Sequence, residues 1–222
     1  MKIPLSARLQ ACCGFVAPGD RVADIGCDHG YLGIYLLKNG IATWVYACDV
    51  NQGPLDSARR NAARFGVAEQ ISFHLSDGVK DVPREFDTLV CAGMGGDTMV
   101  SILTAAPWLK CGQYRLVLQC QSKRELLRQY LSEEGWHITQ EDVLRDGRFL
   151  YTVMEVRWQP DAPRLTPGQV WFPPAMFVHP SPETREYYDR VCFSLDRAIQ
   201  NSKSAADPQW TQALEELRGI TW

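Results

Sequence analysis

The residues of this chain best suited to chemistry lie in a glycine turn, Asp24–Leu32. An apolar, strand-like run stops there at Gly26, and a helix-like segment begins at Tyr31. Such a turn places backbone N–H groups and a helix N-terminus beside the carboxyl end of the strand, where a nucleotide-like ligand can bind. Asp28 and His29 stand where dinucleotide-binding folds place small residues that admit phosphate. A carboxylate there would repel a pyrophosphate and attract a cation, such as the sulfonium and ammonium groups of S-adenosylmethionine.

Two further carboxylates follow the next two strand-like runs. Asp49 ends the second run, about 20 residues past the glycine turn, the spacing at which an acidic side chain accepts hydrogen bonds from ribose hydroxyls. The alternative is that Asp49 caps the following helix. Asp77, in Ser76-Asp77-Gly78, follows the third run and can accept a hydrogen bond from an exocyclic amine such as that of adenine. Alone, Asp-Gly would only mark a turn, but three acidic strand ends in series favour a ligand site.

A fourth strand-like run ends in the glycine-rich segment Gly93-Met94-Gly95-Gly96. Glycines at this density indicate that another group approaches the backbone closely. The segment is not a P-loop, because no Gly-Lys-Ser/Thr follows it. It also lacks the Asn-Pro-Pro-Tyr/Phe pattern by which amino-methylating DNA enzymes hold an exocyclic nitrogen. A turn required only by packing is the alternative, and it is less favoured at a fourth consecutive strand end.

The elements that must position these residues alternate along the chain. A helix is predicted over residues 4–16, with Ser6 near its N-cap. Strand-like runs at 21–26, 43–49, 70–75, 86–92 and 114–120 then alternate with helical patterns at 31–39, 53–65, 97–106 and 123–134. This alternation predicts βαβ units and a mostly parallel α/β sheet. Two last β-rich runs, 136–143 and 149–158, flank the turn signal Arg145-Asp146-Gly147 and predict a terminal antiparallel hairpin.

The remainder of the chain divides by composition. Seven prolines fall between Pro160 and Pro182, which predicts an extended connector whose aromatic residues pack on another part of the protein. Residues 183–203 and 208–217 are predicted to form two helices. We therefore expect three parts: a domain over 1–158, the connector over 159–182, and a helical hairpin over 183–222.

Composition narrows the class of protein. The 222 residues carry a net charge of −3, so no overall charge draws the chain to nucleic acid, although basic clusters occur. The clusters are Arg59, Arg60 and Arg64; Lys123, Arg124 and Arg128; and Arg145 with Arg148. No apolar stretch approaches the ~20 residues that span a bilayer, and we expect a cytoplasmic protein without a membrane partner. The eight cysteines lack metal-ligand spacing and are interpreted as reduced, mostly buried thiols.

The motifs resemble one family in their order. Leu5-Ser6-Ala7-Arg8-Leu9, the turn Asp24–Leu32, Asp49–Pro54, Asp77-Gly78 and Gly93–Gly96 occur as in the bacterial tRNA (adenine-22-N1)-methyltransferases. The resemblance covers residues 4 to 158 and continues more loosely into the C-terminal helices. It implies a Rossmann-like class I methyltransferase sheet, mostly parallel with a terminal antiparallel hairpin, and a small C-terminal helical appendage.

The resemblance implies transfer of a methyl group from S-adenosylmethionine to N1 of adenine 22 in tRNA. We expect the protein to be a monomer or weak homodimer. Asp28, and second His29, would stabilise the product cation or accept a proton from the amine. The alternative role for His29 is a structural hydrogen bond that orients the turn. Cofactor contacts are expected from Gly26, Asp28, Tyr31, Leu32, Asp49, Val50, Asn51, Asp77, Gly78, Gly93, Met94 and Gly95. Substrate contacts are expected from Arg8, Tyr31 and Gly96, and no metal is expected.

Three other functions are alternatives to this one. A methyltransferase acting on a small molecule or a protein would use the same cofactor edge, and an assay on bulk unmodified tRNA against a metabolite panel separates the two. A non-catalytic module that retains the fold conflicts with the acidic strand ends and would not bind the cofactor. A nicotinamide dehydrogenase fits poorly, because Gly26-Cys27-Asp28-His29 lacks the GxGxxG spacing.

Overall fold

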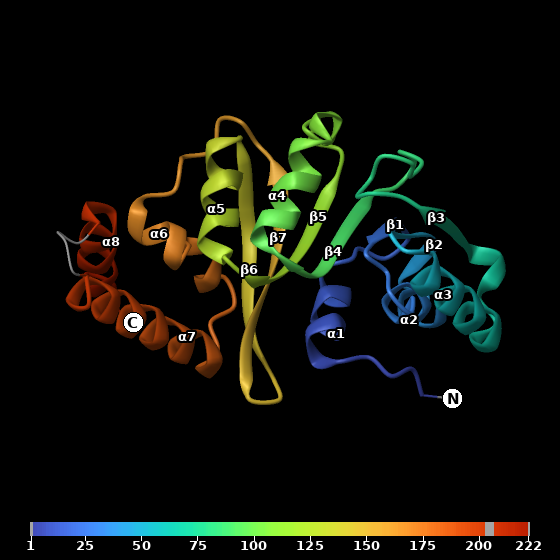
Figure 1. Cartoon of the computed structure of the whole chain (residues 1–222), viewed down its shortest axis with the longest axis horizontal. Helices are drawn as coiled ribbons and strands as arrows, with labels where there is room; N and C mark the ends of the chain where they lie inside the picture. The colour runs from blue at the N-terminus through green and yellow to red at the C-terminus, as the bar shows by residue number, and fades with distance from the viewer. Residues whose placement is uncertain (1, 203–206, 222) are drawn as a thin grey trace.

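The computed structural model describes residues 2–202 and 207–221 (Figure 1). Its strands and helices alternate as the sequence predicted. In chain order they are α1 (Ala7–Gly14), β1 (Asp20–Ile25), α2 (Tyr31–Lys38), β2 (Ala42–Asp49), α3 (Gln52–Phe65), η1 (Ala68–Gln70), β3 (Ile71–Leu75), β4 (Thr88–Gly95), α4 (Gly96–Thr104), η2 (Pro107–Leu109), β5 (Arg115–Ser122), α5 (Arg124–Glu133), β6 (Trp136–Asp146), β7 (Phe149–Trp158), α6 (Pro167–Trp171), η3 (Pro174–Phe177), α7 (Pro182–Gln200) and α8 (Pro208–Arg218). The predicted helix over 183–203 ends earlier, at Gln200, and residues 203–206 and 222 of the predicted appendage lie outside the described residues.

The described strands form one sheet in the order β3-β2-β1-β4-β5-β7-β6. β1 pairs in parallel with β2 and β4, and the parallel ladder continues to β3 on one side and β5 on the other. β7 is antiparallel to both β5 and β6, which confirms the predicted terminal hairpin. From β1 the chain adds β2 and β3 on one side, and then returns to add β4 and β5 on the other side. The direction of the connections therefore reverses at the β1–β4 pair, and open α/β sheets bind ligands at such a reversal.

Alternation along each strand divides the core between the two faces of the sheet. In β1, Val22 packs with the side chains of α1, α2 and α3, whereas Ala23 packs with those of α4 and α5. The same alternation places Val90 and Leu89 of β4 on opposite faces. A sheet buried on both faces explains why its strands are nearly continuous hydrophobic runs in the sequence.

Two local predictions need correction. The fourth strand does not end at residue 92, because β4 continues through Gly95 and pairs with β5 across register shifts. Gly93, at φ +82°, supplies the backbone conformation that the irregularity requires. In the predicted connector, α6 and η3 form although proline is abundant, because Pro167 and Pro174 stand in the first turns, where the missing N–H is not needed.

The C-terminal helices join the sheet through a separate apolar cluster. Its buried members come from the hairpin, the connector, α7 and α8, and the packing of connector residues such as Phe172 and Met176 was expected. Figure 1 shows α7 and α8 at one end of the molecule and α3 at the other. No helix within residues 2–202 and 207–221 combines the length and the apolar character needed to cross a bilayer.

Arg128 is not part of an exposed basic cluster with Lys123 and Arg124, because its side chain is buried. It is fully buried and binds both carboxylate oxygens of Glu141, at 3.0 Å and 2.7 Å. Its remaining N–H groups donate to the carbonyls of Val170 and Trp171 and to the hydroxyl of Tyr187. This side chain therefore joins α5 to β6, α6 and α7, and it has no free donor for a ligand.

Candidate active site

The acidic strand ends meet at one edge of the sheet because their strands are parallel neighbours in register. Ile25 of β1 lies opposite Cys48 of β2 and Cys91 of β4, and Asp49 lies opposite Leu75 of β3. The residues that follow these strands must therefore gather at the same edge.

A cavity of about 560 Å³ occupies this edge. Of the residues predicted to bind the cofactor, it brings together Gly26, Asp49, Val50, Asp77, Gly78 and Met94. It is also lined by residues that the sequence did not single out: Ile25, Ser76, Asp97, Thr98, Ser101 and Ile102. Val50 keeps 63% of its surface exposed, although valine is ordinarily buried, so the cavity carries an apolar surface that a planar ligand could cover.

Asp49 is oriented by two backbone N–H groups. Its Oδ1 accepts from Asn51 N at 2.9 Å and its Oδ2 accepts from Asp28 N at 3.2 Å. The carboxylate is largely buried, and each oxygen retains a lone pair for a ligand hydroxyl. Asn51, not Asp49, is the N-cap of α3. The carboxylate thus ties the end of β2 to the turn after β1.

A second, smaller cavity of about 200 Å³ adjoins the first, since Gly26 lines both. It gathers the predicted residues Arg8, Asp28, His29, Tyr31, Leu32 and Gly93, together with Leu9, Asp24, Gly26, Cys27 and Ala92. Asp28 takes a left-handed conformation, at φ 49°, with its side chain 70% exposed. Its Oδ1 lies 3.7 Å from Nε2 of His29, whose ring lies 5.8 Å from that of Tyr31.

Gly26 allows the two cavities to meet. Its φ is +72°, and a Cβ at this position would collide with Cε of Met94. A side chain at residue 26 would therefore fill the junction between the cavities.

Asp24 belongs to the site, although its position in the turn motif did not predict a role for it. It lies at the end of β1, is 4% exposed, and lines the smaller cavity. Its Oδ2 has no hydrogen-bond partner among the described residues. Burial raises the pKa of this carboxyl to about 7; the N–H of Gly33 acts in the opposite sense, and the charge of Asp49 adds to the rise. The signal in the sequence was an acidic residue two positions before the glycine that ends a buried strand.

Gln119 is a second residue that the sequence did not reveal. Its side-chain oxygen accepts from Nη1 of Arg8 and from the backbone N of Gly93, each at 3.1 Å. This fully buried amide within β5 thus holds the guanidinium of Arg8 against the last residues of β4. No local pattern predicts a contact between residues 111 positions apart.

The neighbours of the glycine-rich segment are groups of the protein itself. A Cβ at Gly93 would lie 3.1 Å from Nη1 of Arg8, and one at Gly95 would lie 3.1 Å from the hydroxyl of Ser122. One at Gly96 would collide with the carbonyl oxygen of Lys123. Gly95, Gly96 and Asn51 line neither cavity as the described residues define them, so their predicted ligand contacts stay predictions.

Comparisons with known proteins find matches over most of the chain. Residues 5–154 match the family model described as a methyltransferase domain. The tRNA (adenine(22)-N(1))-methyltransferase of Bacillus subtilis is 32% identical over 154 residues, 69% of this chain and 65% of that protein. A relative from Mycoplasma genitalium is 32% identical over 138 residues and is matched over 61% of its length. The chain therefore spans less than two thirds of these curated relatives.

Solved structures match over nearly the whole chain. The B. subtilis m1A22 tRNA methyltransferase superposes with a TM-score of 0.80 at 28% identity, covering 98% of this chain and 95% of that one. A Streptococcus pneumoniae protein, a candidate tRNA (m1A22) methyltransferase solved with S-adenosyl-L-methionine, gives a TM-score of 0.83 at 25% identity, covering 96% and 98%. These findings confirm the resemblance found in the motifs and the predicted Rossmann-like fold with a helical C-terminal part.

Proposed function

The chain belongs to the methyltransferase-domain family, and from that premise we propose that it transfers a methyl group from S-adenosylmethionine to N1 of adenine 22 in tRNA. One observation carries the proposal. Acidic residues at successive strand ends line the larger cavity. This cavity shares Gly26 with a smaller one, which Asp28 and Arg8 line. A donor site thus adjoins a site with a carboxylate and a cation, as methylation of a nucleotide base requires. The named base and RNA come from the B. subtilis relative.

The residues present fit the cofactor. Asp24 lines the smaller cavity, which shares Gly26 with the larger one, and offers a buried carboxylate oxygen with no partner among the described residues, which suits an ammonium donor. Asp49 is held in place to accept from ribose hydroxyls, and Asp77 lies at the same cavity for an exocyclic amine. Val50 presents the apolar surface that an adenine ring would cover. When bound, S-adenosylmethionine supplies an electrophilic methyl group on a sulfonium.

We assign to Asp28 the role of acting at the substrate. N1 of adenine carries an in-plane lone pair, and its methylation leaves a positive charge shared with the exocyclic amine. The carboxylate of Asp28 stabilises that charge or accepts a proton from the amine. Its side chain is 70% exposed and lines the smaller cavity, and its backbone N–H is held by Asp49. His29, next to it, is the second candidate for this role.

Arg8 and Tyr31 complete the smaller cavity as substrate-binding residues. N1 of a paired adenine is hidden within the duplex, so the base must be unpaired or flipped out to react. The ring of Tyr31 can stack on such a base, and the guanidinium of Arg8, fixed by Gln119, can bind an adjacent phosphate. We further propose that the protein is cytoplasmic and a monomer or weak homodimer. Its parts would be a methyltransferase domain over 1–158, a connector over 159–182 and a helical hairpin over 183–222.

Incubation with S-adenosylmethionine and an unmodified tRNA transcript, followed by mass-spectrometric mapping of the modified nucleotide, tests the proposal. The expected product is 1-methyladenosine at position 22. A transcript with another base at that position should gain no methyl group there. Methylation of a metabolite or a protein, with tRNA left unmodified, would overturn the substrate assignment while retaining the reaction class. A chain that does not bind the cofactor in calorimetry would overturn both.

A further inference from the structure

We propose that the tip of the β6–β7 hairpin is a second contact for the tRNA, at which Phe149 stacks on an unpaired base and Arg148 binds the adjoining phosphate. The inference rests on the proposed tRNA substrate and adds to it the surface that holds the RNA outside the catalytic cavity. Three features carry it: where the tip lies, what fixes it, and what it exposes.

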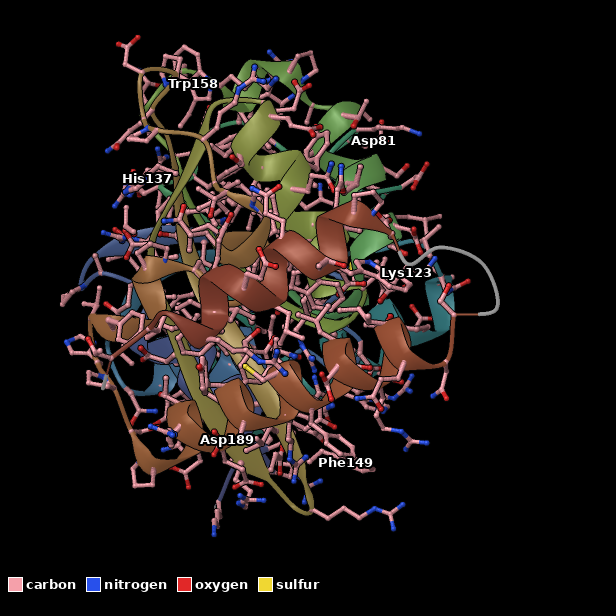
Figure 2. All side chains as sticks on the ribbon, turned by 90° about the vertical axis from the view of Figure 1, so that its left-hand side faces the viewer. Asp81, Lys123, His137, Phe149, Trp158 and Asp189 are labelled. Atoms are coloured by element: carbon pink, nitrogen blue, oxygen red, sulfur yellow. The ribbon has the colours of Figure 1, made fainter. Side chains whose placement is uncertain are left out.

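The direction of β7 brings the tip to the active-site edge. β7 is antiparallel to β5, so it begins where β5 ends, at the edge to which the carboxyl ends of β1, β2 and β4 also point. The ladder between β5 and β7 covers only Leu116–Leu118 and Met154–Val156. Residues 149–153 continue past it and, among the described strands, pair only with β6. Figure 2 shows the two ends of β7, Phe149 and Trp158, at opposite ends of the molecule.

Contacts on two sides fix the tip. The carboxylate of Asp146 accepts from the backbone N of Arg8 at 3.4 Å, which ties the turn to the start of α1. Arg145 pairs with Glu186 of α7. Since Arg8 also lines the smaller cavity, one residue of α1 contacts both the hairpin turn and the cavity that Asp28 lines. An element held in advance loses less conformational entropy when it binds.

The tip exposes an aromatic ring and a cation side by side. Phe149 keeps 51% of its surface in solvent, and the guanidinium of Arg148 lies 4.9 Å from the centre of its ring. The ring of Tyr151, 6.4 Å away, supports Phe149 edge-on. Arg148 takes part in no ion pair among the described residues, so its charge is available to a phosphate.

This chemistry fits RNA better than a protein partner. An exposed ring beside an unpaired guanidinium is the combination that stacks a base and binds its phosphate. A stable protein interface needs a surface of roughly 800 Å² per partner with an apolar centre, and the tip offers one ring flanked by charged residues. Loops and bulges of tRNA provide the unstacked bases that such a site requires.

The test compares Phe149→Ala, Phe149→Trp and Arg148→Ala with wild type. For each protein, the Kd of an unmodified tRNA transcript is measured at several salt concentrations, the kcat and KM of methylation are determined, and cofactor affinity is measured by calorimetry. Phe149→Ala should weaken tRNA binding about 5- to 150-fold, raise KM accordingly, and leave kcat and cofactor affinity within about twofold. Phe149→Trp should retain binding. Arg148→Ala should reduce the salt dependence of binding by about one phosphate contact.

Phe193→Ala is the matched control. Phe193 is also exposed, at 64%, and lies 5.8 Å from the guanidinium of Arg197, but it stands on α7 and not at the hairpin tip. If Phe149→Ala binds tRNA as wild type does, or if Phe193→Ala weakens binding equally, the tip is not the contact. Failure of the proposed function has a different signature, because then the wild-type protein itself leaves the tRNA unmethylated.

Discussion

The carboxylate of Asp49 accepts the backbone N–H of Asp28 across 3.2 Å. Two acidic residues, 21 positions apart, are thus joined so that one points to the larger cavity and the other to the smaller. The contact explains how Asp28 keeps a left-handed backbone with an exposed side chain. It also couples the residue proposed to hold the cofactor to the residue proposed to act on the base.

Asp28→Asn should lower kcat for methylation about 100- to 1000-fold while cofactor affinity stays within a few-fold. Asparagine keeps the shape of the side chain and tolerates the left-handed backbone at φ 49°, so the variant removes only the charge. Asp28→Ala should be at least as inactive, and it should also lower the free energy of unfolding, because alanine adopts the left-handed backbone less readily than aspartate does. Single-turnover methylation of a tRNA transcript measures the loss, and turnover close to wild type in Asp28→Asn would remove Asp28 from its role.

Asp49→Ala should weaken cofactor binding roughly 10- to 150-fold, since a charge-assisted hydrogen bond contributes about 1.5–3 kcal/mol. It should also lower kcat, because the N–H of Asp28 loses its acceptor. Asp49→Asn should be impaired too, as its NH₂ would face one of the two N–H donors that the carboxylate now accepts. Calorimetry with the cofactor provides the measurement. Asp56→Ala, one turn into α3, is the acidic control and should bind normally.

Cofactor affinity should fall as the pH drops below about 7. The pKa of Asp24 is about 7 in the folded protein without ligand, and an ammonium group would bind its ionised form, so a proton must leave on binding. Calorimetry at pH 8 and pH 6 should show weaker binding at pH 6, by up to about tenfold per unit below the pKa. Asp24→Asn should lose this dependence. A pH-independent wild-type affinity would contradict the role of Asp24.

The same carboxyl makes a prediction about folding. Because the folded pKa of about 7 lies above the unfolded value of 3.8, the folded state holds the proton more tightly, and its stability falls as pH rises between these values. Asp24→Asn should therefore gain stability relative to wild type from pH 4.5 to pH 8. Urea unfolding of both proteins at the two pH values measures the difference, and an equal gap at both values would show that Asp24 is ionised in the folded protein throughout.

Arg128→Met should lower the free energy of unfolding by about 3–5 kcal/mol, because it leaves Glu141 buried without its partner. The double variant Arg128→Met/Glu141→Leu should recover most of that loss, as no isolated charge remains. Urea unfolding measures both. Arg190→Met is the control: its pair with Glu186 is exposed on α7, and its loss should change stability by less than about 0.5 kcal/mol. An equal effect of the two single variants would contradict the proposed importance of burial.

The sequence by itself determined the order of strands and helices, the terminal hairpin, and the residues at the carboxyl ends of the parallel strands. These follow from local periodicity and from the rule that parallel strands end at one edge. Gly26, Asp49 and Asp77 were therefore found without knowledge of the folded chain, because strand ends can be read from the sequence one at a time.

Only the tertiary structure decided which of these groups are paired and which are free. Contacts between distant segments decide three features of the protein. These are the carboxylate oxygen of Asp24 that has no partner among the described residues, the buried ion pair of Arg128 and Glu141, and the hydrogen bonds of Gln119 to Arg8 and Gly93. Burial and hydrogen-bond partners are properties of the packed neighbourhood, and the same residue types in the same order are compatible with other neighbours. The order of strands along the chain thus determines which residue types gather at this edge. Packing determines which of them are buried, charged or hydrogen-bonded.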